Sequence, residues 1–231
     1  MRGETDGERG RTAGIVLAGG RSSRLTAGGI DPPGGKASLS LGGIPLLARV
    51  VAAVGAVAPR TVVVAAPGQP LPALPAGVGV IRDSRPGSGP LAALADGLAA
   101  LAPVAPVERV VVVSCDVPLV APPLLRLLLD RLGEEPGARW WVVPEVGGHL
   151  QVLLSVLRPA LAPAIDDWLA AGRRDPRSLV ERLHAERPGR VEIVPEAVLR
   201  RADPDLSGFR DLDTAADLDA LRRTLEAGGE S

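Results

Sequence analysis

Residues 14–25 read GIVLAGGRSSRL. A continuous apolar run leads into the adjacent pair Gly19 and Gly20, and arginines follow directly. Such a run is typical of a strand that is buried on both faces of a sheet. In open α/β sheets ligands bind beyond the carboxyl ends of the strands, so this loop lies where an anionic ligand would bind. The alternative is an ordinary strand-to-loop turn whose arginines are solvated.

Further β-branched runs alternate with helical patterns along the chain. This alternation predicts βαβ crossovers and therefore an α/β protein with a mostly parallel central sheet and helices on both faces. Strands are expected at 12–18, 61–66, 77–82, 109–115, 140–144, 149–157 and 190–195. Helices are expected at 44–54, 91–101, 124–132, 159–171, 175–183 and 214–226.

The composition narrows the class of protein. The 231 residues are 46% hydrophobic, which suits one domain with a sizeable core. The formal net charge is −1 and aromatic residues make up 2%, so neither a nucleic-acid partner nor a membrane surface is expected. Residues 1–11 are charged and lack the apolar segment of a secretory signal, so we expect a disordered tail. The single cysteine, Cys115, suits a reducing compartment, and we predict a soluble, cytoplasmic protein with one domain over 12–228.

The glycine loop matches neither of two familiar phosphate loops. The dinucleotide fingerprint G-x-G-x-x-G fails because the two glycines are adjacent, and the P-loop pattern fails around Lys36. The parts of an anion site are nevertheless present. Gly19 and Gly20 allow backbone N–H groups to approach a phosphate, Arg24 offers a fork of donors, and Lys36 adds a mobile point charge.

A carboxylate follows a second buried run. Asp116 comes directly after the valine-rich segment 110–115 and is therefore expected at the same edge of the sheet. A carboxylate there can hold Mg²⁺, which takes one or two protein carboxylates together with phosphate oxygens and water. The alternative is that Asp116 caps a helix beginning near residue 121. Cys115 is expected to be a packed strand residue.

Two more acidic stretches are candidates for the site. Asp83 follows the strand at 77–82 and precedes a glycine-containing loop that runs into a helix. The stretch FRDLDTAADL carries Asp211 and Asp213, and Thr214 is well placed to cap the last helix. Helix capping accounts for Asp213 and Thr214 as well as a ligand-binding role does.

Five stretches in this order resemble the molybdenum cofactor guanylyltransferases, a family of the nucleotidyltransferase superfamily. They are LAGGRSSR, LGGIPLLARV with Lys36 before it, DSRPGSGPLAALADGL, CDVPLV and DLDTAADLDAL. The resemblance covers residues 14–226. It implies a three-layer, Rossmann-like nucleotidyltransferase fold with a nucleotide-binding half at 12–120 and an acceptor-binding half at 121–228.

The resemblance also implies an activity. GMP would pass from GTP to the phosphate of a molybdenum-molybdopterin acceptor, giving a guanine dinucleotide cofactor and pyrophosphate, with Mg²⁺ as cofactor. Molybdoenzymes or other cofactor-biosynthesis proteins are the implied protein partners. The family's nucleotide-binding positions correspond to Leu17, Ala18, Gly19, Gly20, Lys36, Asp83 and Asp116. The implied catalytic residues are Arg24, Lys36 and Asp116, and the implied metal ligands are Asp116 and Asp213.

The match departs from the family around Lys36, where the segment from Arg24 is longer and Gly35 stands in place of an aspartate. Two alternatives therefore remain. One is a cytidylyl- or sugar-phosphate nucleotidyltransferase, and the other is a partner protein that binds nucleotide without turnover. In the second half, His149, Arg173 and Arg174 are candidate contacts to a pterin, although surface arginines are commonly just solvated.

Overall fold

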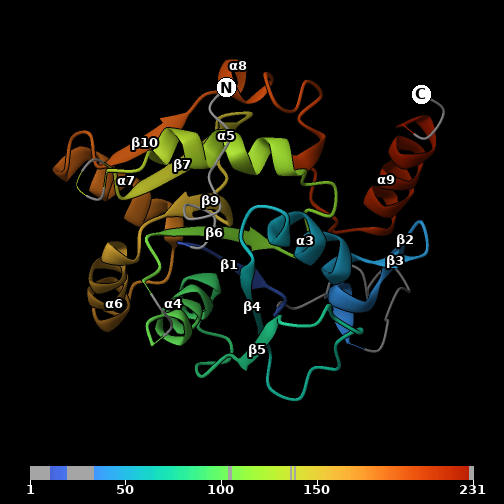
Figure 1. Ribbon diagram of the computed structural model, residues 1–231, viewed down its shortest axis with the longest axis horizontal. Helices are drawn as coiled ribbons and strands as arrows, with labels where there is room; N and C mark the ends of the chain where they lie inside the picture. The colour runs from blue at the N-terminus through green and yellow to red at the C-terminus, as the bar shows by residue number, and fades with distance from the viewer. Residues whose placement is uncertain (1–10, 20–33, 104–105, 136, 138, 229–231) are drawn as a thin grey trace.

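A computed structural model describes residues 11–19, 34–103, 106–135, 137 and 139–228. Gly20 and Arg24 lie outside these residues. The central sheet has the strand order β10-β7-β9-β6-β1-β4-β5, which runs from top to bottom in Figure 1. These strands are β1 (Thr12–Leu17), β4 (Arg60–Ala65), β5 (Gly79–Arg82), β6 (Arg109–Ser114), β7 (Trp141–Val146), β9 (Leu154–Leu157) and β10 (Val191–Val194).

All pairings along this order are parallel except those of β9. Strand β9 runs antiparallel to both of its neighbours, β6 and β7, and the short β8 (His149–Leu150) pairs antiparallel with β7. The prediction of a mostly parallel sheet is confirmed, while the segment expected as one strand at 149–157 forms two strands separated by a turn. Because the other strands are parallel, their carboxyl ends meet at one edge.

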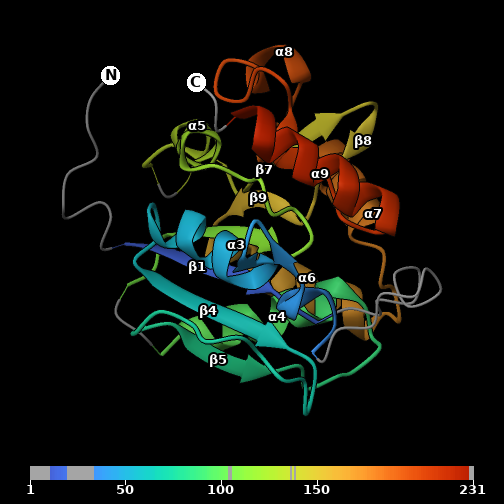
Figure 2. The same ribbon diagram turned by 90° about the vertical axis from the view of Figure 1, so that its right-hand side faces the viewer.

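Helices cover both faces of the sheet, as predicted. One face carries α3 (Leu46–Gly55), α5 (Pro122–Leu132) and α8 (Glu196–Leu199). The other carries α4 (Pro90–Leu101), α6 (Ala162–Ala170) and α7 (Pro176–Glu186). In Figure 2, α3 lies in front of β1 and α4 behind β4.

Neighbouring residues of one strand supply both hydrophobic cores. In β1, Val16 packs in the core beneath α3 and α5, whereas Ile15 packs in the core beneath α4. Both side chains are fully buried. This two-sided burial is the physical reason for the continuous apolar runs in the sequence.

Two expectations about local structure were wrong. The helix expected at 44–54 begins only at Leu46, because Ile44 and Pro45 form the short strand β3 (Ile44–Pro45) opposite β2 (Ser40–Leu41). Gly42 and Gly43, with φ of +58° and +77°, make the two-residue turn of this hairpin. The strand expected to be buried at 77–82 is the edge strand β5, and its side chains are mostly exposed because it pairs only with β4.

The last helix, α9 (Ala215–Gly228), packs against the β2–β3 hairpin rather than against the sheet (Figure 1). A third, small core joins it to the rest of the molecule, with Leu41, Leu46, Leu212, Leu218 and Leu221 buried together. This packing returns the segment before α9 to the carboxyl edge of the sheet. None of the described helices has both the length and the apolar character that crossing a bilayer requires.

Candidate nucleotide-binding site

The end of β1 begins the site. Leu17 and Ala18 are buried, and the Ala18 N–H donates to the Val64 carbonyl at 2.8 Å. Gly19 follows at the surface, and a Cβ atom there would lie 3.3 Å from the backbone nitrogen of Ala66. The backbone at Gly19 therefore runs close to the end of β4, in a place where a larger residue would crowd its neighbour. Gly20 and Arg24, also predicted for this loop, lie outside the described residues.

Gln69 braces this loop, and the sequence analysis missed it. Its side-chain oxygen accepts from the Ala66 N–H at 3.0 Å, and its amide nitrogen donates to the carbonyls of Ala18 and Gly34 at 3.1 and 2.9 Å. One side chain thus joins the ends of β1 and β4 to the segment that carries Lys36. The available signal was a single amide side chain in an otherwise proline- and glycine-rich loop after a buried strand.

Lys36 lies in a short 3-10 helix (Gly35–Ser38) that opens with Gly34 in a left-handed conformation, at φ +93°. A Cβ atom on Gly34 would lie 2.5 Å from the Pro70 carbonyl oxygen, so only glycine fits there. The Lys36 ammonium forms an ion pair with the Asp213 carboxylate. Lys36 is also the only lysine in the chain, which otherwise uses arginine for its basic residues.

Asp116 lies in the turn that follows β6, two residues after the strand ends. The Cys115 N–H donates to the Leu17 carbonyl at 2.9 Å, and the Leu212 N–H donates to the Asp116 carbonyl at 2.8 Å. The half-buried Asp116 carboxylate makes no hydrogen bond with any described residue. Helix α5 is capped at Ala121, so Asp116 is not a capping residue.

Cys115 is a packed residue, as expected. It is 5% exposed, and burial raises the pKa of its thiol to about 12, with the neighbouring Asp116 carboxylate adding to the rise. Only the thiolate is an effective nucleophile, so the buried Cys115 thiol is a poor nucleophile at neutral pH.

The segment before α9 brings more carboxylates to the same place. Partial burial raises the pKa of Asp211, and the negative charges of Asp213 and Asp116 raise it further. Thr214 and Asp217 form a reciprocal capping box: the Asp217 N–H donates to the Thr214 hydroxyl at 3.2 Å, and the Thr214 N–H donates to the Asp217 carboxylate at 2.6 Å. The predicted capping by Thr214 is confirmed, whereas the Asp213 side chain pairs with Lys36 instead.

Asp116, Asp211 and Asp213, here called the acidic cluster, supply part of the ligand set that Mg²⁺ needs. In the described ranges, no group of three or more His, Cys, Asp and Glu side chains is arranged to hold a metal ion. Mg²⁺ needs fewer protein ligands than that, since it usually retains waters and binds substrate phosphates. The mutual repulsion of Asp116, Asp211 and Asp213 marks a place where a hard cation would be stabilised. Asp116 and Asp213 therefore fit the donor set that Mg²⁺ prefers.

A cavity of about 680 Å³ lies at the carboxyl ends of β1, β4 and β6. Its volume is in the range of small-molecule sites, and apolar side chains and backbone dominate its walls. Gly19 and Ser114 line it, so it reaches the ends of β1 and β6 and stops two residues short of Asp116. The lining residues are Leu17, Gly19, Val64, Ala66, Asp83, Pro86, Gly87, Gly89, Pro90, Ala93, Ser114 and Leu153.

The loop from Asp83 to Gly89 forms one wall of this cavity. The Asp83 N–H donates to the Ala65 carbonyl at 2.8 Å, and the Asp83 carboxylate accepts from the Arg85 N–H at 2.8 Å. Gly89, with φ +89°, leads into α4, and a Cβ atom there would lie 3.9 Å from the Arg174 carbonyl oxygen. The α6–α7 connection thus borders the same wall.

Three other polar residues of the second half lie in separate surroundings. His149 is exposed in β8. The Arg173 guanidinium is stacked on the Trp168 ring at 4.6 Å, which gives it a structural role. His184, in α7, has its Nδ1 atom 3.0 Å from the Val191 carbonyl oxygen.

Fold and site together define an α/β protein with a cavity at the carboxyl edge of its mostly parallel sheet, which is where proteins of this class bind ligands. Comparison with known proteins agrees. The family described as the MobA-like NTP transferase domain matches residues 14–187. The chain belongs to this family, and it is an enzyme, a nucleotidyltransferase.

Sequence relatives carry a narrower name. A probable molybdenum cofactor guanylyltransferase of Mycobacterium bovis (strain BCG / Pasteur 1173P2) is 39% identical over 171 residues, covering 73% of this chain and 79% of the relative. One of Mycobacterium avium (strain 104) is 35% identical over 209 residues, covering 90% and 94%.

Solved structures share the fold. Molybdopterin-guanine dinucleotide biosynthesis protein A of Archaeoglobus fulgidus superposes with a TM-score of 0.69 at 23% identity, covering 93% of this chain and 99% of that one. A 2-C-methyl-D-erythritol 4-phosphate cytidylyltransferase of Thermus thermophilus gives 0.64 at 20% identity, with the same coverages of 93% and 99%. The predicted nucleotidyltransferase fold is confirmed.

Proposed function

We propose that this nucleotidyltransferase transfers GMP from GTP to the phosphate of a molybdopterin-type acceptor and releases pyrophosphate. The observation that carries the proposal is the cavity bounded by Gly19, Asp83 and Gly89, which lies at the carboxyl ends of β1, β4 and β6. The names of the relatives at 35% and 39% identity support the guanylyl branch.

Asp83 supports a preference for guanine. Asp83 lines the cavity, and its Oδ1 atom accepts from the Arg85 N–H, while Oδ2 accepts no hydrogen bond from any described residue. Guanine presents two adjacent N–H donors on its base-pairing edge, whereas adenine and cytosine each present one amino group beside acceptors. A carboxylate accepts both donors of guanine, and it repels the acceptor nitrogens of the other bases.

The chemistry needs no general base. A phosphate monoester has a second pKa of about 6, so the acceptor is mostly a dianion at neutral pH. One of its oxygens forms a bond to the α-phosphorus as the bond from that phosphorus to the bridging oxygen of the β-phosphate breaks. The electron pair leaves with pyrophosphate, and no proton has to move. The chain then has to position the two reactants and neutralise charge.

The charged residues near Cys115 and the exposed Gly19 suit this task. The Lys36 ammonium supplies positive charge to the phosphates, provided that it leaves Asp213 or is shared with it. Asp116 and Asp213 would hold a Mg²⁺ ion, which supplies charge neutralisation at the phosphate oxygens. The Gly19 backbone can approach a phosphate closely because it carries no side chain.

The acceptor is proposed to lie toward the second half of the chain. The α6–α7 connection contains Arg174, whose backbone borders Gly89 at the cavity wall. An acceptor between this connection and the end of β6 would present its phosphate toward Asp116. The assignment of residues 121–228 to acceptor binding remains a prediction, as do the proposed protein partners.

Calorimetric titration with GTP, CTP and ATP in Mg²⁺ tests the proposal. Wild-type protein is expected to bind GTP most tightly, and Asp116→Asn is expected to weaken this binding. Asp130→Asn is the matched control, because Asp130 is an exposed carboxylate on α5. Preferred binding of CTP would overturn the guanylyl assignment. Binding of GTP without Mg²⁺-dependent release of pyrophosphate in the presence of acceptor would overturn the catalytic one.

A further inference from the structure

Helix α4 carries one charged residue among apolar ones. Its sequence is PLAALADGLAAL, and Asp96 and Gly97 interrupt the leucines and alanines. Both are poor helix formers. Gly97 has a packing reason, because a Cβ atom there would lie 2.9 Å from side-chain atoms of Ile15 in β1. Packing against the sheet does not explain why a charged residue stands at position 96, so the polar contacts of its side chain must explain it.

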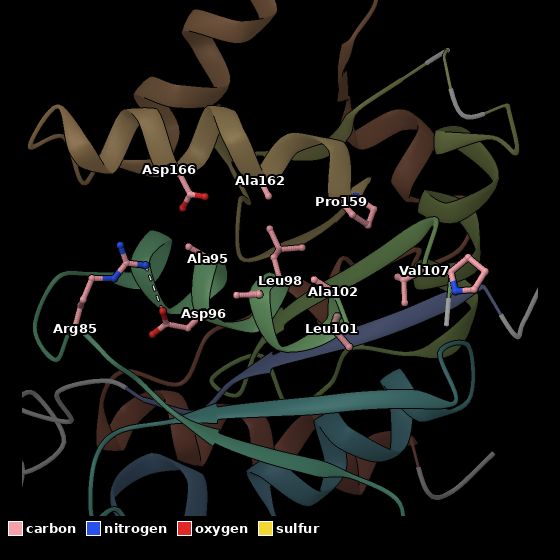
Figure 3. A pocket seen from close by; sticks show the side chains of 12 residues that line it. Arg85, Ala95, Asp96, Leu98, Leu101, Ala102, Val107, Pro159, Ala162 and Asp166 are labelled. Carbon is pink, nitrogen blue, oxygen red and sulfur yellow. Dashed lines mark hydrogen bonds and ion pairs between the residues drawn. The ribbon is translucent and has the colours of Figure 1, made fainter. Parts of the chain in front are cut away.

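The Asp96 carboxylate receives three donors from the loop after β5. The Ser84 N–H donates to Oδ2 at 2.7 Å and the Ser84 hydroxyl to Oδ1 at 2.9 Å. The Arg85 guanidinium donates to Oδ1 at 3.3 Å, and Figure 3 shows this ion pair. The Asp96 side chain is only 14% exposed, so these charge-assisted bonds are partly shielded from water.

The loop that Asp96 binds forms one wall of the proposed nucleotide cavity. Ser84 and Arg85 stand between Asp83, which lines the cavity, and the lining segment from Pro86 to Gly89. Arg85 is held twice more, since its N–H donates to Asp83 at 2.8 Å and its guanidinium donates to the Ala92 carbonyl at 3.4 Å. A shift of these two residues would therefore move Asp83 directly.

Asp96 itself lies outside the nucleotide cavity. It lines a separate cavity of about 460 Å³ between α4 and α6, across which Asp166 of α6 faces the Arg85–Asp96 pair (Figure 3). Asp96 thus contacts the loop without itself lining the first cavity.

We propose that Asp96 is a positioning residue, which fixes the loop from Asp83 to Gly89 as the wall of the nucleotide cavity by binding Ser84 and Arg85. The nature of the nucleotide rests on the proposed function, whereas the fixing of the loop does not. Asp96 determines how well Asp83 is pre-arranged for the base. Its loss lowers nucleotide affinity rather than the rate of the chemical step.

Two variants and one control test this role by calorimetry. Asp96→Ala removes all three bonds and is expected to raise the Kd for the preferred nucleotide about tenfold or more, as loss of hydrogen bonds to a charged group does. Asp96→Asn retains one acceptor oxygen and is expected to give a smaller rise. Asp166→Asn removes a carboxylate from the same cavity that makes no bond to the loop, and its Kd is expected to match that of wild type.

Amide hydrogen exchange gives a second readout that needs no nucleotide. Asp96→Ala is expected to speed exchange at Ser84 and across the loop to Gly89, while β1 and β6 keep their protection. Unchanged exchange in the loop would overturn the proposal, and so would faster exchange with an unchanged Kd. If wild-type protein binds none of the three nucleotides, the proposed function fails, and the exchange experiment alone decides whether Asp96 fixes the loop.

Discussion

Lys36 and Asp213 form an ion pair although 177 positions separate them in the chain. The neighbouring Leu212 N–H donates to the Asp116 carbonyl at 2.8 Å. The segment before α9 therefore holds both Lys36 and Asp116, one through a side chain and one through the backbone. The C-terminal part of the chain completes a site whose other residues come from its first half.

Replacing Lys36 should impair turnover more than folding. Lys36→Met removes the ammonium of the chain's only lysine and is expected to lower kcat by about 10²- to 10³-fold, the usual cost of losing one electrostatic contact to a transition state. The measurement is pyrophosphate release at saturating GTP. Arg223→Met, at an exposed position of α9, is the control. A kcat within about twofold of wild type would show that Lys36 does not act on the phosphates.

The single lysine also permits a direct binding test. Amine-reactive reagents can modify only Lys36 and the chain's α-amino group, because no other lysine is present. Mg²⁺ and GTP together are expected to slow modification of Lys36 and to leave the α-amino group unaffected. Peptide mass spectrometry after timed labelling distinguishes the two sites. Equal labelling of Lys36 with and without nucleotide would contradict its placement on the phosphates.

The turn before Lys36 should tolerate no side chain. Gly34→Ala places a Cβ atom 2.5 Å from the Pro70 carbonyl oxygen at a φ of +93°. Gly43→Ala is the matched control, because it has a similar φ of +77° but nothing within 4 Å of the added atom. Both variants carry the cost of a left-handed alanine, about 1 kcal/mol, whereas only Gly34→Ala adds a collision. Urea denaturation is expected to show a clearly larger loss for Gly34→Ala.

Cys115 should be inert toward thiol reagents in the folded protein. Burial raises the pKa of its thiol to about 12, so the reactive thiolate is almost absent under mildly alkaline labelling conditions. Ellman's reagent is expected to react at full rate only after denaturation. Because the chain has one cysteine, the absorbance change reports on this residue alone. Rapid labelling of native protein would mean that the end of β6 opens readily.

Asp175 should stabilise α7 in a pH-dependent way. Its carboxylate caps the helix by accepting from the backbone N–H groups of Arg177 and Ser178, and the Ser178 hydroxyl bond is the main cause of its lowered pKa. A lowered pKa in the folded state means that this stability is present above the ordinary aspartate value of about 3.9 and is lost as the pH falls through the folded value.

The corresponding experiment compares Asp175→Ala with wild type in chemical denaturation. At neutral pH the variant is expected to lose about 1 kcal/mol of unfolding free energy, as for other N-cap replacements. The difference should shrink as the pH is lowered below about 4, where the capping carboxylate becomes protonated. Asp205→Ala, at an exposed position, serves as the control. A loss that stays constant with pH would exclude the capping carboxylate as its source.

Features encoded in contiguous residues were predictable. The run that ends at Gly19 and the run that ends before Asp116 each combine a strand with the residue at its carboxyl end, and parallel pairing brings such ends together. The hairpin at Ser40–Pro45 was not predicted, because its two glycines equally suit a loop before a helix. Ile44 also fits the helical spacing of the apolar residues that follow it, so the pattern predicts a helix where the hairpin ends.

Residues whose role depends on distant partners were not predictable. Gln69 joins three separate backbone segments, and Asp96 is bound to a loop that lies before its own helix. For neither residue does a local sequence pattern indicate which segment it would bind. Hydrogen bonds between segments leave almost no trace in the spacing of one sequence.

The sequence by itself determined the alternation of strands and helices, the glycine at the end of β1 and the carboxylate at the end of β6, because these follow from local burial and chain geometry. Only the tertiary structure decided that Asp213 pairs with Lys36 rather than capping α9. That choice depends on the small core around Leu41 and Leu212, which folds the C-terminal segment against the hairpin. The packing of apolar residues that are distant in sequence determines which partner the Asp213 carboxylate reaches. No single stretch of the sequence contains this information.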